Sequence, residues 1–173
     1  GMKQKLSLSC CLVHRPDILL LDEPTFGVDP ISRRELWMIL HEMVNEGITI
    51  VLTTSYLDEA ERCDRVALLD EGRTLALDDP ASLQRSLDGT LWVIRTDRPR
   101  DARDALRAHP PVGTAMLFGD VVHALTAGDP GPESLSALLE AHEIEVRDIA
   151  RTEPSLEDVF IQLVAGKEGT AHG

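Results

Sequence analysis

The segment Ile18-Leu19-Leu20-Leu21-Asp22-Glu23-Pro24 joins a run of apolar residues to two adjacent carboxylates. A short, continuous apolar run predicts a strand buried on both faces, as in a parallel sheet covered by helices on each side. In open α/β sheets, ligands bind outside the carboxyl ends of the strands. We therefore expect Asp22 and Glu23 to lie at a ligand-binding edge of a parallel sheet.

The two carboxylates suit different tasks at that edge. Asp22 is suited to Mg²⁺, which takes oxygen ligands and usually keeps several waters, so we expect the contact to run through water. Glu23 points the other way along the strand and can orient or deprotonate a water as a catalytic residue. The alternative is a strand that simply ends in a polar loop, and the following string Thr25-Phe26-Gly27-Val28-Asp29-Pro30 argues against it.

A helix is expected directly after this segment, because Asp29 can cap it and Pro30 suits its first position. Apolar residues then recur at helical spacing on one predicted buried face: Leu36, Ile39, Leu40, Met43 and Val44. Gly47 stands where a glycine commonly ends a helix. Strands over 48–52, 66–69 and 74–77 alternate with short helices over 57–62 and 79–89, which favours a parallel α/β layer.

The second half of the chain has another pattern. Strands are expected over 91–95, 115–118, 121–125 and 144–149, with helices around 102–106 and 135–139. The resulting order β-α-β-β-α-β is typical of a ferredoxin-like α+β domain. Pro154 begins a last helix, residues 166–173 are expected to form a flexible tail or linker, and residues 2–14 are expected to form a first helix.

Composition excludes several classes of function. The 173 residues include 17 basic and 30 acidic side chains, for a net charge of −13. The acidic excess is shared by both halves, and no basic patch could hold nucleic acid, so we expect no nucleic-acid partner. The longest apolar runs fall far short of the about twenty residues of a membrane span. Three cysteines provide neither a disulfide framework nor metal-ligand spacing.

Five segments resemble the ATP-binding-cassette (ABC) ATPase family. Gly1–Leu8 resembles the end of the signature motif and its helix, Leu21–Pro24 resembles Walker B with the catalytic glutamate, Gly27–Asp29 resembles the D-loop, Ala60–Arg65 resembles the segment after the switch loop, and Pro154–Phe160 resembles the accessory domain of ABC-2-type exporter ATPases. The resemblance covers nearly the whole chain.

The resemblance implies a fold, two cofactors and several site residues. Residues 1–89 would form the C-terminal part of a P-loop NTPase (RecA-like) core, 90–165 an accessory domain, and 166–173 a tail or linker. ATP and Mg²⁺ would be the cofactors. Gly1 is either the last signature glycine, whose N–H meets a phosphate, or a tag remnant before Met2. Asp29 would serve the D-loop, cap its helix, or do both.

Two departures from the family pattern matter. No Gly-rich loop with Gly-Lys-Ser/Thr is present, so the chain resembles a C-terminal piece that alone binds ATP poorly and hydrolyses it negligibly. The family's Thr-Thr-His switch reads Thr53-Thr54-Ser55 here. Serine donates one hydrogen bond but is shorter than histidine and carries no charge. We expect this degenerate switch to lower turnover on the order of 100-fold or more.

Two strings, 27–37 and 54–61, are similar to the first half of tandem two-cassette exporter ATPases such as those of bacterial multidrug efflux systems. This resemblance implies an integral-membrane permease of ABC-2 type and a second cassette, in the same chain or as a homo- or heterodimer. It also implies a peripheral position at the cytoplasmic face of the inner or plasma membrane. A non-hydrolytic regulatory half is the alternative. A DNA-repair or chromosome ATPase would need coiled-coil heptads and basic surfaces, which the sequence lacks.

Overall fold

A computed structural model describes residues 6–8, 10–11, 13–14, 16–110 and 112–170, with only the backbone for 167–170. The chain forms two compact units, residues 1–60 and 61–173, which are described separately. Of the helix expected over 2–14, the described residues 6–8 and 10–11 are helical. Gly1 lies outside the described residues, so its two interpretations stay open.

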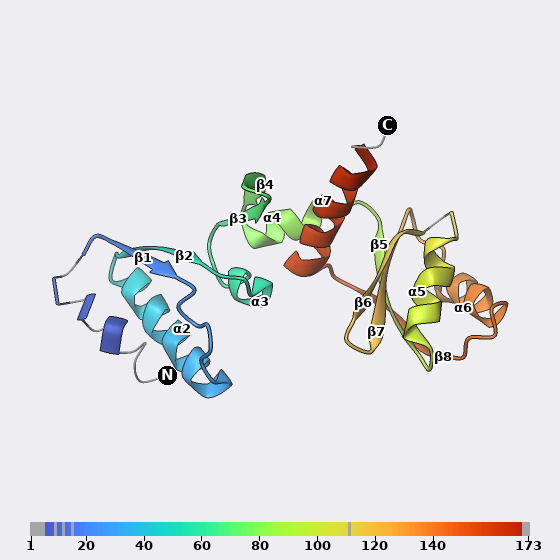
Figure 1. The fold of residues 1–173 in the computed structure, drawn as a ribbon, viewed down its shortest axis with the longest axis horizontal. Helices are drawn as coiled ribbons and strands as arrows, with labels where there is room; N and C mark the ends of the chain where they lie inside the picture. The colour runs from blue at the N-terminus through green and yellow to red at the C-terminus, as the bar shows by residue number, and fades with distance from the viewer. Residues whose placement is uncertain (1–5, 9, 12, 15, 111, 171–173) are drawn as a thin grey trace. The chain divides into compact units, whose positions relative to one another are not determined.

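The first unit contains a parallel pair of strands, with helix α2 between them along the chain and α3 after them (Figure 1). Strand β1 (Ile18–Asp22) pairs with β2 (Thr49–Thr53) in parallel, so that Asp22 lies opposite Thr53. Helix α2 (Pro30–Asn45) connects them and packs against β2, and α3 (Leu57–Ala60) follows β2. The predicted parallel pairing is confirmed, and it brings the carboxyl ends of the two strands together.

Helix α2 begins as its sequence predicts. The Asp29 side chain accepts a hydrogen bond from the backbone N–H of Ser32 at 3.0 Å, and Pro30 occupies the first turn. The buried face consists of Leu36, Trp37, Leu40 and Met43. Val44 was predicted on that face but is exposed. Trp37 is buried instead, because the larger ring reaches the interior from the edge of the apolar stripe.

Helix α2 ends in a Schellman motif. Gly47 has a φ of 95°, a left-handed conformation that costs glycine little. Its N–H donates to the carbonyl of Val44 at 2.9 Å, and the N–H of Ile48 donates to that of Met43 at 3.1 Å. These two bonds are the ones that define the motif. They turn the chain directly into β2.

Strand β1 is not buried on both faces, contrary to the prediction. Leu19 is buried, whereas Ile18 is 59% exposed and Leu20 is 74% exposed. Val51 of β2 is also exposed, at 55%. Side chains alternate across a strand, and α2 covers one face of a sheet of only two strands. The apolar run therefore leaves an apolar sheet face, formed by Ile18, Leu20 and Val51, in contact with solvent.

The second unit starts with a separate hairpin. Strand β3 (Val66–Asp70) pairs with β4 (Arg73–Asp78) in antiparallel fashion, and Glu71-Gly72 forms the turn between them. The turn at Glu71-Gly72 lies where the sequence predicts the chain to return as a further strand, and two residues can join only antiparallel neighbours. Helix α4 (Pro80–Arg85) follows, and Asp79 caps it by accepting from the N–H of Ser82.

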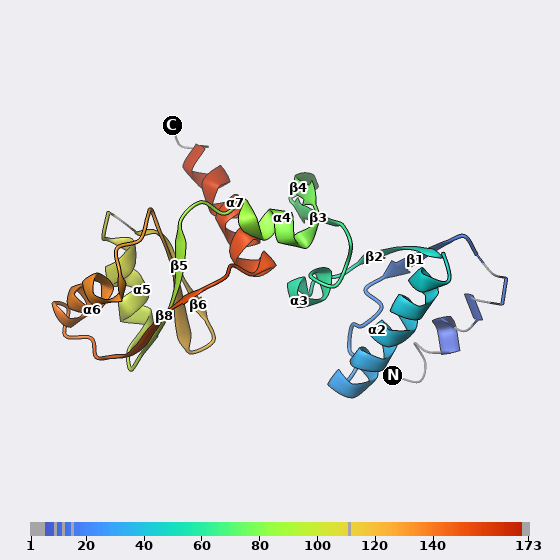
Figure 2. The same ribbon diagram turned by 180° about the vertical axis from the view of Figure 1, so that it is seen from behind.

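The rest of this unit is built on a four-stranded antiparallel sheet. Its elements are β5 (Thr90–Thr96), α5 (Pro99–Arg107), β6 (Val112–Phe118), β7 (Val121–Thr126), α6 (Pro132–Glu140) and β8 (Val146–Thr152). The strand order β6-β7-β5-β8 is that of the split β-α-β pattern, as predicted. Helices α5 and α6 cover one face of the sheet and α7 lies on the other (Figure 2). The core between sheet and helices includes Ile94, Leu106, Ala115, Val122 and Leu139.

Helix α7 (Leu156–Thr170) closes the second face of that sheet and contacts α4. Leu156 and Val159 are buried. The helix extends through Thr170, into the segment 166–173 that is predicted to be a flexible tail or linker. Within the described part of the chain, no helix combines the length and the apolar character needed to cross a bilayer.

Candidate functional site

The carboxyl ends of β1 and β2 hold two of the predicted site residues. The Thr53 hydroxyl donates a 2.5 Å hydrogen bond to Asp22 Oδ1. The backbone N–H of Glu23 donates to both the carbonyl and the hydroxyl of Thr53, at 3.1 Å each. Asp22 and Glu23 are therefore fixed to the end of β2, at the sheet edge where the sequence predicts them.

Glu23 has an unusual backbone conformation. Its φ is 44°, which is uncommon for a residue with a side chain and costs about 1–3 kcal/mol when the surrounding structure enforces it. The conformation turns the chain sharply after β1, and the N–H of Phe26 donates back to the Glu23 carbonyl at 3.1 Å. Strain of this kind often marks functional sites. The sequence contains no signal for it, because glutamate is not a residue that favours this conformation.

Ser55, the residue predicted at the switch position, lies next to the Glu23 carboxylate. The Ser55 hydroxyl donates to Glu23 Oε2 at 3.4 Å, and both side chains reach solvent. The structure thus brings Glu23 and Ser55 together across thirty-odd residues of sequence, with Asp22 adjoining them. The catalytic roles assigned to Glu23 and Ser55 and the metal role of Asp22 stay predictions.

Asp29 lies at the start of α2, and the structure confirms that it caps this helix. The hydrogen bond from the Ser32 N–H is the main cause that holds the pKa of Asp29 below its usual value. The turn before it is closed by the Val28 N–H, which donates to the Thr25 carbonyl at 3.0 Å. The D-loop role of Asp29 stays a prediction.

A buried carboxylate that the sequence analysis did not single out lies beneath this edge. Glu59 of α3 is 1% exposed. Its Oε2 accepts hydrogen bonds from the hydroxyls of Thr25, at 2.8 Å, and Thr54, at 3.3 Å. The acidic neighbours of Glu59 are exposed, and a one-turn helix has no periodicity to distinguish an inward from an outward position. Residue type and spacing therefore could not identify it.

Arg33 completes the group around Glu59. Its Nε lies 3.3 Å from Glu59 Oε1, and its guanidinium lies 4.3 Å above the centre of the Tyr56 ring. The Tyr56 N–H in turn donates to the Thr54 hydroxyl at 3.1 Å. A buried carboxylate is costly unless a positive charge and hydrogen-bond donors surround it, and Glu59 has both.

The chemistry of the edge suits a hard cation. Asp22 and the Thr53 hydroxyl provide oxygen atoms at an exposed position, which is the ligand type that Mg²⁺ takes from proteins. Among the residues that the structure describes, no three His, Cys, Asp or Glu side chains are grouped so as to hold a metal by themselves. This donor set fits an ion that takes one carboxylate from the protein and its other ligands from water and phosphate.

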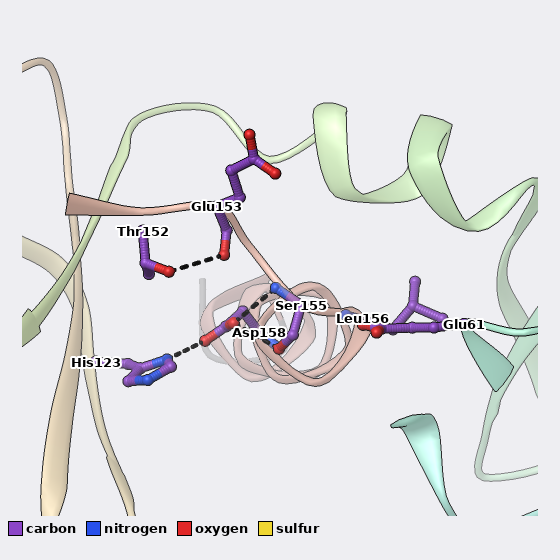
Figure 3. A network of polar contacts seen from close by, with 7 residues as sticks. All are labelled: Glu61, His123, Thr152, Glu153, Ser155, Leu156 and Asp158. Atoms are coloured by element: carbon purple, nitrogen blue, oxygen red, sulfur yellow. Dashed lines mark hydrogen bonds and ion pairs between the residues drawn. The ribbon is translucent and has the colours of Figure 1, made fainter. Parts of the chain in front are cut away.

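The second unit contains a Ser-His-Asp grouping that has a structural role (Figure 3). Asp158 accepts from the Ser155 hydroxyl at 2.6 Å, from the Ser155 N–H at 2.9 Å, and from His123 Nδ1 at 2.7 Å. A nucleophilic relay needs the imidazole between serine and carboxylate. Here the carboxylate lies in the middle, and the Asp158 N–H donates back to Ser155 Oγ, which makes a capping box for α7.

The environment of Asp158 shifts its ionisation. Burial raises the pKa of this carboxyl, but hydrogen bonds from His123 and Ser155 outweigh burial, so that its pKa lies below the usual value. Glu61 adds a further contact, since its Oε1 accepts from the N–H of Leu156 at 2.8 Å. The first turn of α7 is therefore held by side chains from three other places in the sequence of this unit: residues 61, 123 and 155.

Comparison with known proteins shows which proteins this chain resembles. The relatives of this chain are ATP-binding proteins of ABC transporters, and the predicted resemblance to exporters of this kind is confirmed. The chain is 40% identical over 168 residues to the probable multidrug ABC transporter ATP-binding protein YbhF of Escherichia coli (strain K12). It is 36% identical over 169 residues to the daunorubicin/doxorubicin resistance ATP-binding protein DrrA of Streptomyces peucetius.

A third relative has a different cargo in its name: the Nod factor export ATP-binding protein I of Burkholderia orbicola (strain AU 1054), 38% identical over 173 residues. These alignments cover 94–97% of this chain. The chain spans 28% of YbhF, 51% of DrrA and 53% of the Nod factor protein. No protein-family model matches the chain.

Proposed function

We propose that this chain is part of the ATP-binding and ATP-hydrolysing subunit of an ABC-type exporter, of the multidrug kind. The observation that carries the proposal is the edge where Asp22, Glu23 and Ser55 meet, in a chain related to exporter ATP-binding proteins. In this proposal the chain supplies Walker B, the D-loop and the switch position of a nucleotide site. ATP and Mg²⁺ are its cofactors.

Each residue at the edge has a distinct task. Asp22 would hold Mg²⁺ through water, and the ion would supply charge to a bound triphosphate. Glu23, held by two hydrogen bonds from its N–H to Thr53, orients a water and accepts its proton. Ser55 donates to Glu23 and offers no positive charge, so the site lacks what a histidine provides in the family's switch.

The remaining parts of the nucleotide site would come from chain outside this sequence. The phosphate-binding loop is absent from these 173 residues, and the relatives are about two to four times longer. The exposed apolar sheet face of Ile18, Leu20 and Val51 supports the same inference, because a soluble cassette would cover such a surface. We infer that this chain alone binds ATP poorly and turns it over negligibly.

The partners follow from the class of relative. An integral-membrane permease of ABC-2 type would carry the cargo and determine its identity. A second cassette, in the same chain or in a homo- or heterodimer, would complete each nucleotide site. The complex would place this chain at the cytoplasmic face of the inner or plasma membrane. Residues 90–165 would be an accessory domain that stabilises or regulates the assembly.

A second function is favoured by Ser55: a regulatory half that binds ATP without hydrolysing it. The test is Mg-ATP turnover of the complete subunit purified with its permease, with Glu23→Gln compared against Glu42→Gln, the same charge change at an exposed position of α2. If this half hydrolyses ATP, Glu23→Gln lowers turnover and Glu42→Gln does not. Turnover that survives Glu23→Gln at the wild-type level favours the regulatory function.

A further inference from the structure

The Glu59 side chain contacts three segments: Thr25, Thr54 and Arg33. Each of these residues lies within a few positions of a residue of the proposed nucleotide site. We propose that Glu59 is a positioning residue, which holds the segments bearing Glu23, Ser55 and Asp29 in a fixed arrangement. The inference rests on the proposed function of the site. It concerns a residue that does not itself reach the edge, since Glu59 is buried below it.

The first segment leads to Glu23. Thr25 is fully buried, and its hydroxyl donates to Glu59 at 2.8 Å. Only Pro24 lies between Thr25 and the strained backbone of Glu23, and the proline ring restricts the conformations of that short link. The contact at Thr25 therefore limits how far the Glu23 carboxylate can move away from the end of β1.

The second segment leads to Ser55. Thr54 precedes Ser55 directly, and its hydroxyl donates to Glu59 while it accepts from the N–H of Tyr56. These two bonds fix the backbone on both sides of Ser55. The same carboxylate oxygen of Glu59 thus holds Thr25 and Thr54, which sets the distance between Glu23 and Ser55.

The third segment leads to Asp29. Arg33 lies in the first part of α2, and its N–H donates to the Asp29 carbonyl at 2.9 Å. Its side chain pairs with Glu59 Oε1 and stacks on Tyr56. The start of α2, which carries Asp29, is therefore tied through one ion pair to the other two segments.

This arrangement predicts a specific kinetic effect. Catalysis by oriented groups is sensitive to displacement, and a shift of about 1 Å costs up to about 100-fold in rate. In Glu59→Gln the amide keeps the volume and can still accept from a threonine, but it removes the charge that pairs with Arg33. We expect kcat for ATP to fall about 10- to 100-fold while KM changes less than about threefold. KM is spared because the proposed phosphate-binding loop lies elsewhere.

The experiment uses the complete subunit with its permease and follows Mg-ATP turnover against ATP concentration, with the unfolding temperature measured for each variant. Thr25→Val removes only one hydroxyl from the group and guards against misfolding of Glu59→Gln. Leu40→Ala is the structural control, because Leu40 lies on the buried face of α2 and its side chain can make no hydrogen bond to Glu59. All variants are assayed well below their unfolding temperatures.

The inference is supported if Glu59→Gln and, more weakly, Thr25→Val lower kcat with little change in KM, while Leu40→Ala lowers only the unfolding temperature. It is overturned if folded Glu59→Gln and Thr25→Val both keep the wild-type kcat, or if Leu40→Ala lowers kcat as much as they do. Glu23→Gln, assayed in parallel, separates the two hypotheses. If Glu23→Gln loses turnover and Glu59→Gln does not, the proposed function stands and the role of Glu59 fails.

Discussion

Replacing Asp158 by alanine should loosen the start of α7 in the second unit. The side chain is nearly buried and accepts three hydrogen bonds, two from Ser155 and one from His123. The Ser155 cap survives this substitution, because Ser155 Oγ accepts from the backbone N–H of residue 158, and only the bonds to the carboxylate are lost. Loss of a hydrogen bond that involves a charged group costs about 1.5–3 kcal/mol.

The costs of losing these three bonds do not simply add, because the bonds share one carboxylate and the His123 side chain is 18% exposed. We therefore expect Asp158→Ala to lower the free energy of unfolding at neutral pH by about 2–3 kcal/mol. The unfolding free energy of Asp158→Asn should lie between those of wild type and Asp158→Ala, because the asparagine amide oxygen still accepts one hydrogen bond. Urea unfolding of the protein measures these differences, with Asp148→Asn, an exposed position on β8, as the matched control.

The effect of Asp158 should also depend on pH in a definite direction. Its pKa is lowered in the folded protein, so its stabilising contribution is complete above the pKa of the unfolded chain. That part of the stability is lost as the pH falls through the folded pKa, so the difference in unfolding free energy between wild type and Asp158→Ala should narrow below about pH 4. A neutral-pH difference below about 0.5 kcal/mol, or one that stays constant into acid, would refute the reasoning.

Three other outcomes are expected. Ser55→His in the complete subunit should raise Mg-ATP turnover or leave it flat, since it restores a group that can carry charge, and a fall to background would contradict the idea of a weakened switch. Gly89→Ala should destabilise the second unit strongly in thermal unfolding, because Gly89 has a φ of 120° and an added Cβ would lie 2.4 Å from the Thr126 carbonyl oxygen. The isolated chain should show negligible Mg-ATP turnover, and substantial turnover of the purified chain would show that no further chain is needed.

The sequence predicted helix caps and strand ends correctly where neighbouring residues determine them. The cap at Asp29, the glycine after α2 and the strand ending at Asp22 all follow from neighbouring residues, and the structure has them. The β-α-β-β-α-β order was readable because each strand and turn has its own pattern. Its sheet order then follows from the few topologies that such an order allows.

The features that the sequence did not predict depend on residues far apart in the chain. An apolar run predicts that other elements pack on both faces of a strand. It does not tell whether this chain contains those elements. Leu20 is exposed because nothing packs on its face of β1 within the described residues. Glu59 was missed because its inward position depends on Thr25, Thr54 and Arg33, which are distant in sequence. The left-handed backbone of Glu23 is accompanied by hydrogen bonds to Thr53, a residue distant in sequence, and glutamate itself does not favour this conformation.

The uncovered face of β1 and β2 has a practical consequence. A two-stranded sheet has unpaired backbone groups along its outer edges, and here those edges adjoin the side chains of Ile18, Leu20 and Val51. Edges of this kind pair readily with other copies. If expressed without the rest of a cassette, the polypeptide should self-associate as its concentration rises, and it should accumulate in inclusion bodies more readily than a variant with lysine in place of Leu20.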